Sequence, residues 1–177
     1  MKTLLATAGL SGVQSIRQVP DSALLLGGRP LFLEEDEQQA HMLLMPAVRI
    51  SRLGLAIGER FAARYFDAAT VVALRTRGGR IQPDETDLIA DAALAVDIWQ
   101  PLPDNGIWEV GMPDGSRIEW NTAGVFERML SEISARTTFK TGDILVAASL
   151  HTEATLAPGG KSEILLNGTP TLRLKIR

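Results

Sequence analysis

The chain has 177 residues, a length that suits one domain with a sizeable core rather than two full domains. Its net charge of −3 provides no basic footprint for nucleic acid, so we expect no nucleic-acid partner. The absence of cysteine excludes disulfides, thiolate metal sites and cysteine nucleophiles. The two histidines, His41 and His151, are too few for a histidine-rich metal site.

The first ten residues are interpreted as an ordinary strand and loop rather than a targeting segment. Their apolar run is short, is interrupted by Thr7 and Gly9, and lacks a cleavage signature. No stretch of the chain approaches the roughly 18 apolar residues that a membrane span requires. We therefore expect a cytoplasmic protein with no membrane partner.

Residues 1–45 are predicted to form the N-terminal, β-rich part of a single domain that covers residues 1–177. Two apolar runs between residues 22 and 33 flank Gly27 and Gly28, and paired glycines at a tight turn indicate a hairpin. The four consecutive acids at residues 34–37 are typical of a solvated helix start, where the helix dipole favours negative charge. We assign these acids no function.

The middle of the chain alternates apolar runs with short helix-like segments. Residues 94–99 suit either a helix continued from Asp84 or an extended segment, and the sequence leaves both open. The other predicted elements are a strand at 48–57, a helix at 59–66, a strand at 70–75, a helix beginning at Asp84, and a hairpin of residues 107–110 and 117–120 around a turn at 113–116.

The last third of the chain contains the clearest helix. Asn121 or Thr122 can cap it, and its apolar side chains fall at helical spacing on one face: Val125, Phe126, Met129, Leu130 and Ile133. Three β runs follow at residues 144–150, 162–166 and 171–176, and the last two are predicted to form a hairpin. The pattern predicts a mostly β, α+β fold with two or three helices, either a mixed β-roll or a barrel.

A turn pattern occurs twice near the end of the chain. Lys140-Thr141-Gly142-Asp143 is echoed by Ala157-Pro158-Gly159-Gly160, and each copy leads into an apolar strand. This order of helix, turn, strand, turn and hairpin resembles the C-terminal half of the fumarylacetoacetate hydrolase family, although Gly160 stands where that family usually has Asp. Three upstream segments extend the resemblance over residues 46–177: Leu53 to Gly58 ("LGLAIG"), Ala69 to Arg75 ("ATVVALR") and Asp97 to Pro103 ("DIWQPLP").

The resemblance implies the β-roll of that family and a chemistry that needs Mg²⁺ or Mn²⁺ to polarise an oxo-acid carbonyl. The family holds the metal with a Glu-x-Glu pair on one strand and an Asp on the next. These ligands fall on Ile50, Arg52 and Arg75, and none of the three can hold a metal. A family lysine falls near Leu94, and a Thr-Gly-Thr segment falls on residues 147–149.

No slip of a few residues restores the metal ligands, because Glu59 is the only acid between residues 45 and 65. We therefore predict a fold that was kept after its catalytic site was lost, with no metal cofactor. We hypothesise that Arg52 and Arg75 bind a carboxylate or phosphate of a small metabolite, since Arg suits bidentate capture of such groups. The favoured alternative is that they pair with internal acids such as Glu59 or Asp97, or point to solvent, because buried charges are usually paired.

Ser149 and His151 would lie on one face of a strand and form a candidate pair. A catalytic dyad also needs an orienting acid and oxyanion donors that the sequence does not identify, so a structural pair is favoured. The candidate ligand-binding residues are therefore Arg52, Arg75, Asp97, Ser149 and His151.

Three functions remain open from the sequence. The first is a non-catalytic protein that binds a small carboxylate metabolite. The second is an active hydrolase or lyase that cleaves C–C bonds or decarboxylates oxo-acids, as the resemblance alone implies. The third is an assembly partner, as a homodimer or in a hetero-oligomer with an active paralogue, because a β-roll leaves sheet edges to be covered.

Overall fold

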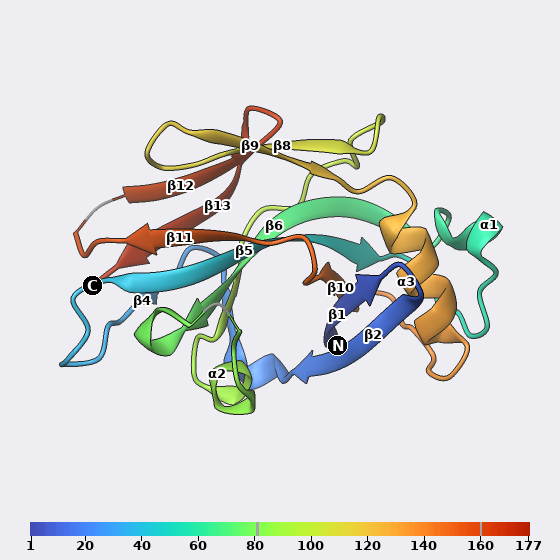
Figure 1. Cartoon of the computed structure of the whole chain (residues 1–177), viewed down its shortest axis with the longest axis horizontal. Coiled ribbons are helices and arrows are strands. Elements are labelled where there is room, and N and C mark those ends of the chain that lie inside the picture. Colours follow the sequence, from blue (N-terminus) through green and yellow to red (C-terminus); the bar gives the residue numbers. More distant parts are fainter. Residues whose placement is uncertain (81, 160) are drawn as a thin grey trace.

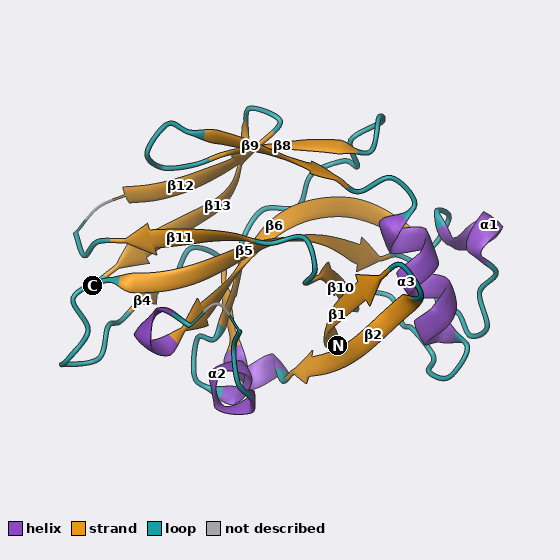
Figure 2. Ribbon diagram, in the orientation of Figure 1, coloured by secondary structure: helices purple, strands orange, loops and turns teal. Residues whose placement is uncertain are grey.

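The computed structural model describes residues 1–80, 82–159 and 161–177, which form two β-sheets with short helices around them (Figures 1 and 2). The larger sheet has the strand order β2-β1-β10-β5-β6-β7-β3, and β11 also pairs with β5. Its strands are β1 (Thr3–Gly9), β2 (Gly12–Val19), β3 (Leu24–Leu26), β5 (Ala40–Ile50), β6 (Phe66–Thr76), β7 (Leu94–Val96), β10 (Ile144–Ala147) and β11 (Thr152–Leu156). The larger sheet curls into a half-barrel, which confirms the prediction of a mostly β fold of the β-roll type.

The smaller sheet has the order β4-β13-β12-β8-β9 and lies above the larger one in Figure 1. Its strands are β4 (Pro30–Leu31), β8 (Ile107–Gly111), β9 (Arg117–Asn121), β12 (Lys161–Leu166) and β13 (Thr169–Ile176). The predicted hairpins β8–β9 and β12–β13 are confirmed. Strand β11 was not predicted from the sequence, and the predicted run at residues 144–150 ends in the sheet at Ala147.

The long antiparallel pair β5–β6 is the centre of the molecule. Its register runs from His41 opposite Thr76 to Ile50 opposite Phe66, and most of its residues are buried. Because successive strand residues point to opposite faces, alternate residues of β5 belong to two different cores. Leu44 and Val48 lie in the larger core, whereas Leu43 and Met45 lie in the smaller one. Both faces of this pair are therefore covered by protein.

Helix α3 (Val125–Ser134) confirms the clearest helix prediction and buries Phe126, Met129, Leu130 and Ile133. Its N-cap is Gly124 rather than Asn121 or Thr122, with a left-handed φ of 71° that glycine adopts readily. Helix α2 (Glu85–Ile89) begins at Asp84, whose side chain accepts a hydrogen bond from the Asp87 N–H as predicted for a cap. Residues 94–96 are extended, as β7. No helix of the described ranges is long and apolar enough to cross a membrane.

Several predicted elements in the first half of the chain were wrong. Gly27 and Gly28 do adopt positive φ angles, but β3 and β4 on either side of them form no hairpin. They lie in different sheets, where β3 pairs in parallel with β7 and β4 with β13. The acids at residues 34–37 lie in a turn and begin no helix. The strand predicted at 48–57 leaves the sheet after Ile50, and the helix predicted at 59–66 is the single turn α1 (Glu59–Ala62).

The first copy of the doubled turn anchors the start of the chain. Asp143 is buried, and its carboxylate accepts hydrogen bonds from the backbone N–H groups of Lys2 and Lys140, each at 2.9 Å. This fixes β1 beside β10, with which it pairs in parallel. In the second copy Gly159 has a φ of 78°, while the Asp-to-Gly replacement noted in the sequence falls on Gly160, which lies outside the described residues.

Candidate functional site

The site lies at a break in the pairing of β5. On the edge of β5 away from β6, strand β10 pairs with residues 47–49 and strand β11 with residues 40–44. Met45 and Pro46 fall between these two ladders. Proline has no backbone N–H to donate and is tolerated where a ladder is interrupted. The chain between β10 and β11, residues 148–151, leaves the sheet at this point as a turn.

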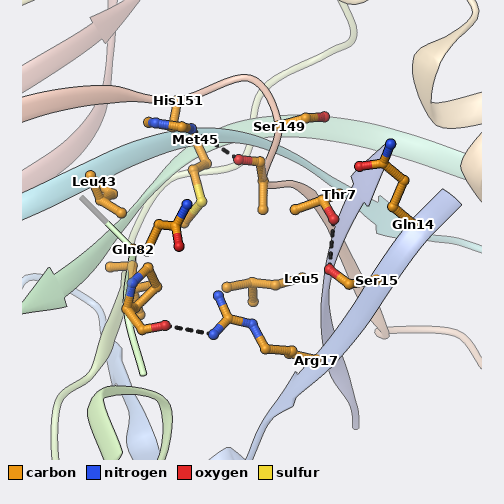
Figure 3. Close-up of a pocket in the computed structure, with 13 residues that line it drawn as sticks. Leu5, Thr7, Gln14, Ser15, Arg17, Leu43, Met45, Gln82, Ser149 and His151 are labelled. Atoms are coloured by element: carbon orange, nitrogen blue, oxygen red, sulfur yellow. Dashed lines mark hydrogen bonds between the residues drawn. The ribbon is translucent and has the colours of Figure 1, made fainter. Parts of the chain in front are cut away.

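A pocket of about 440 Å³ lies beneath this turn, between the β5–β6 pair and the β1–β2 ribbon (Figure 3). Residues of the segment before α2 close one side of it. The pocket is lined by Leu5, Thr7, Gln14, Ser15, Arg17, Leu43, Met45, Leu74, Gln82, Pro83, Ala148, Ser149 and His151. The described residues of the lining thus combine an apolar floor with a polar rim, and none of them carries an acidic side chain.

The floor consists of four aliphatic side chains, Leu5, Leu43, Met45 and Leu74, all nearly fully buried. Leu43 of β5 and Leu74 of β6 lie directly opposite each other in the ladder. Neighbouring strands therefore present hydrocarbon side by side at the bottom of the pocket. Among the described residues, no three histidine or acidic side chains are grouped so that they could hold a metal ion.

The rim carries hydroxyl, amide and imidazole groups. The hydroxyls of Thr7 and Ser15 hydrogen-bond each other across β1 and β2 at 2.6 Å. The backbone N–H of Ala8 donates to Ser149 Oγ at 3.4 Å, and His151 Nδ1 lies 3.1 Å from the carbonyl oxygen of Ala148. Ser149 and His151 thus sit in a turn rather than on a strand. Each bonds to backbone groups instead of forming a Ser–His dyad.

Arg17 is the pocket residue with a permanent positive charge. It extends from β2 opposite Leu5, and its Nη1 donates to the carbonyl oxygen of Pro83 at 2.6 Å (Figure 3). The carboxylate of Glu85 lies 3.9 Å from the same nitrogen, but that side chain is largely exposed. Within residues 1–80, 82–159 and 161–177, Nε and Nη2 have no hydrogen-bond partner, so one edge of the guanidinium is available to a bidentate anion.

Arg17 was not predicted from the sequence as a residue of the site. Alternation along β2 places Ser15 and Arg17 on one face, a signal that the sequence does contain. It does not say which face looks inward, because β2 is an edge strand with polar residues on both faces. Only the pairing of β2 with β1 turns Arg17 towards Leu5 and the pocket.

Arg52 and Arg75 do not share a site. Arg52 is exposed in the loop after the end of β5, whereas Arg75 pairs with Met42 near the start of that strand. Arg75 also follows Leu74, so its side chain points away from the pocket. It is buried, forms an ion pair with Glu37, and donates through Nη1 to the carbonyl oxygen of Phe32 at 3.2 Å. Arg75 therefore pairs with an internal acid, as the alternative prediction held. The acid is Glu37 instead of Glu59 or Asp97.

Asp97 lies outside the pocket lining and is held by Arg173, whose Nε is 3.0 Å from its carboxylate. This hydrogen bond and the charge of Asp97 raise the pKa of Arg173. Of the five candidate residues, Ser149 and His151 lie in the pocket, and Arg52, Arg75 and Asp97 lie elsewhere.

No family model matches the sequence, and no curated protein does, but solved structures match over 99% of the chain. One is 5-carboxymethyl-2-hydroxymuconate delta-isomerase from Mycobacterium smegmatis, with a TM-score of 0.78, 17% identity and 76% of that chain covered. A second is a protein of Yersinia pestis assigned to the fumarylacetoacetate hydrolase family, with a TM-score of 0.76, 19% identity and 92% covered. A third is fumarylpyruvate hydrolase from Pseudomonas aeruginosa in complex with Mn²⁺ and pyruvate, with a TM-score of 0.71, 12% identity and 89% covered.

These comparisons confirm the resemblance at the level of the fold. They also extend it, because residues 1–45 are covered as well as residues 46–177. Strand β5 runs through the boundary at residue 45, so the N-terminal part is built into the same sheets as the rest of the chain.

Proposed function

We propose that the chain binds a small carboxylate in the pocket beneath residues 148–151 without a metal ion, and that it lacks metal-dependent hydrolase or lyase activity. The observation that carries this proposal is the aliphatic floor formed by Leu43, Met45 and Leu74. The fold is shared with a hydrolase that holds Mn²⁺ and pyruvate, so the presence or absence of metal ligands decides between the two functions.

A hard divalent cation needs several oxygen ligands, and carboxylates supply them in proteins. The family pattern places these carboxylates on two neighbouring strands. The neighbouring strands that face this pocket, β5 and β6, contribute leucine and methionine instead. A cation at the floor would lose its hydration with no ligand to replace it, which is strongly unfavourable. The residues present therefore do not fit Mg²⁺ or Mn²⁺.

A carboxylate fits the pocket better than a cation does. Arg17 offers the free edge of its guanidinium, and none of the described residues that line the pocket has an acidic side chain to repel an anion. Glu85 lies outside the lining and is exposed, so water screens most of its effect on Arg17. Ser149 and His151 add polar groups on the other side of the floor, as Figure 3 shows.

Isothermal titration calorimetry of the purified chain tests the proposal. We expect no heat of binding for Mg²⁺ or Mn²⁺, and a carboxylate signal in metal-free buffer that weakens at least tenfold in Arg17→Ala. Arg117→Ala is the matched control, because Arg117 is an exposed arginine that pairs with Glu109 on the β8–β9 hairpin. Metal binding that saturates near one ion per chain would overturn the proposal and favour the active hydrolase or lyase. Carboxylate binding unchanged in Arg17→Ala would remove Arg17 from the site.

A further inference from the structure

The position of Arg17 in the ribbon determines what surrounds a bound carboxylate. Leu5 and Arg17 are direct partners across β1 and β2, so the guanidinium lies beside an aliphatic side chain. Leu5 belongs to the same buried cluster as Leu43, Met45 and Leu74. A carboxylate on Arg17 consequently places the rest of the ligand against continuous hydrocarbon.

That floor provides no donor for a second polar group next to the carboxylate. Leucine and methionine side chains carry no N–H or O–H. A 2-oxo group buried against them would leave its carbonyl oxygen without a hydrogen bond, which is unfavourable compared with a methylene group at the same place. The polar residues of the lining are Thr7, Gln14, Ser15, Gln82, Ser149 and His151, and they come from β1, β2 and the loops rather than from β5 and β6.

We propose that the ligand is an aliphatic monocarboxylate, whose charged end binds Arg17 and whose hydrocarbon body lies on Leu5, Leu43, Met45 and Leu74. The pocket volume of about 440 Å³ is within the usual range for a small-molecule site. This inference rests on the proposed function, since it assumes a metal-free carboxylate site. It specifies the kind of carboxylate by the aliphatic part of the molecule that lies on the floor. Oxo-acids, the substrates that the fold suggests, become the weaker ligands.

Two ligand series in calorimetry test the inference on the unmodified protein. The first runs through acetate, butyrate and hexanoate, and the affinity should rise about fourfold for each methylene that enters the pocket. The second compares hexanoate with 2-oxohexanoate and propionate with pyruvate. We expect the 2-oxo compound to bind about tenfold more weakly in each pair, which is the factor for one missing hydrogen bond.

A pair of methionines in β5 provides a matched test of location. Met45 lies in the pocket floor, whereas Met42, equally buried, lies in the other core. Met45→Ala should weaken hexanoate binding severalfold with little effect on acetate, and Met42→Ala should change neither, with thermal unfolding used to show that both variants are folded. An equal effect of the two substitutions would place the hydrocarbon elsewhere and overturn the inference.

The outcomes separate this inference from the proposed function. If acetate and hexanoate bind equally, or if the 2-oxo acids bind more tightly without metal, the aliphatic ligand is wrong and the metal-free carboxylate site stands. If no carboxylate binds in the absence of metal, both proposals fail together.

Discussion

The two faces of the β5–β6 pair treat charge in opposite ways. On the pocket face, Leu43 and Leu74 meet as hydrocarbon. On the other face, the next residue of β6 is Arg75, which is buried and paired with Glu37. A buried charge is tolerated where a partner of opposite sign is supplied by the same chain. The interior of this protein therefore has a neutralised ion pair on one face, and on the other a nearly fully buried apolar floor with a cation, Arg17, beside it.

This difference limits what each face can do. The Arg75–Glu37 pair neutralises its own charge, and Arg75 Nε is buried without a hydrogen-bond partner among the described residues. Arg17 keeps one edge of its guanidinium unpaired among the described residues, which suits it to bind an anion from outside. The charge that was expected at the site from the sequence is thus present on β6, but on the wrong face and already neutralised.

The largest expected effect comes from breaking the buried ion pair. Glu37→Ala leaves Arg75 buried without its counter-ion, and we expect the free energy of unfolding to fall by about 3–5 kcal/mol. Replacing both residues, as Glu37→Leu with Arg75→Met, should recover most of this loss, because no charge is then left unpaired. Urea denaturation of Glu37→Leu, of Arg75→Met and of the double variant measures how much of the lost free energy of unfolding is recovered. A double variant that is as unstable as the sum of the singles would show that the pair is not the cause.

A polar group on the pocket face should cost somewhat less. Leu74→Asn replaces a fully buried leucine of the floor, and we expect a loss of about 2–4 kcal/mol in the free energy of unfolding. Leu74→Met keeps the apolar volume and should cost less than about 1.5 kcal/mol. Chemical denaturation compares the two variants. If Leu74→Asn were tolerated as well as Leu74→Met, the floor would already contain water or polar partners, and the contrast between the two faces would be lost.

The smallest expected effect on stability comes from the exposed carboxylate of Asp84, which follows the pocket residues Gln82 and Pro83. Hydrogen bonds from the Thr86 hydroxyl and the Asp87 N–H, together with Arg80, lower the pKa of Asp84 to about 2 from its ordinary value of 3.8. A lowered pKa stabilises the folded state above about pH 4, and this stabilisation is lost as the pH falls towards 2. The stability difference between the wild type and Asp84→Asn, which keeps a capping side chain, should therefore disappear over that window.

Denaturation midpoints measured from pH 5 to pH 2 test this expectation for Asp84. Removing the strongest contributor, with Thr86→Ala, raises the pKa of Asp84 and should move the window to higher pH. A difference between wild type and Asp84→Asn that stays constant down to pH 2 would contradict the role of the carboxylate charge.

Local signals in the sequence predicted the local elements. The alternation around the turn at residues 113–116 specified the β8–β9 hairpin, and the helical spacing from Val125 to Ile133 specified α3. The paired glycines at 27 and 28 misled because positive φ angles are common to many turns. The course of the chain there is decided by the parallel pairing of β3 with β7 and of β4 with β13. These partner strands lie far along the sequence, so the residues around Gly27 and Gly28 do not indicate the pairing.

The site could be predicted only in part, because register decides which side chains face the pocket. The motif comparison placed the site on Arg75 of β6, while the residue that faces the pocket is Leu74, one position earlier. A shift of one residue moves a strand side chain to the opposite face. On β5 the comparison reached Ile50 and Arg52, where the strand ends, whereas Leu43 and Met45 line the pocket. Ser149 and His151 were proposed from the alternation of a strand that the structure does not have there, since both lie in the turn that bridges the break in β5.

The parallel pairing of β1 with β10 makes the pocket a late product of folding. Its register joins Thr3 to Ile144 and Ala6 to Ala147, so it closes a loop that contains most of the chain. Such distant contacts form slowly, because the loss of chain entropy comes before the contacts that compensate it. The β1–β2 ribbon can form early as a local hairpin, but Leu5 and Arg17 meet the floor only after β10 has left the ribosome. A chain truncated before β10 would have no strand to join β1 to β5, so the pocket between the ribbon and the β5–β6 pair would not form.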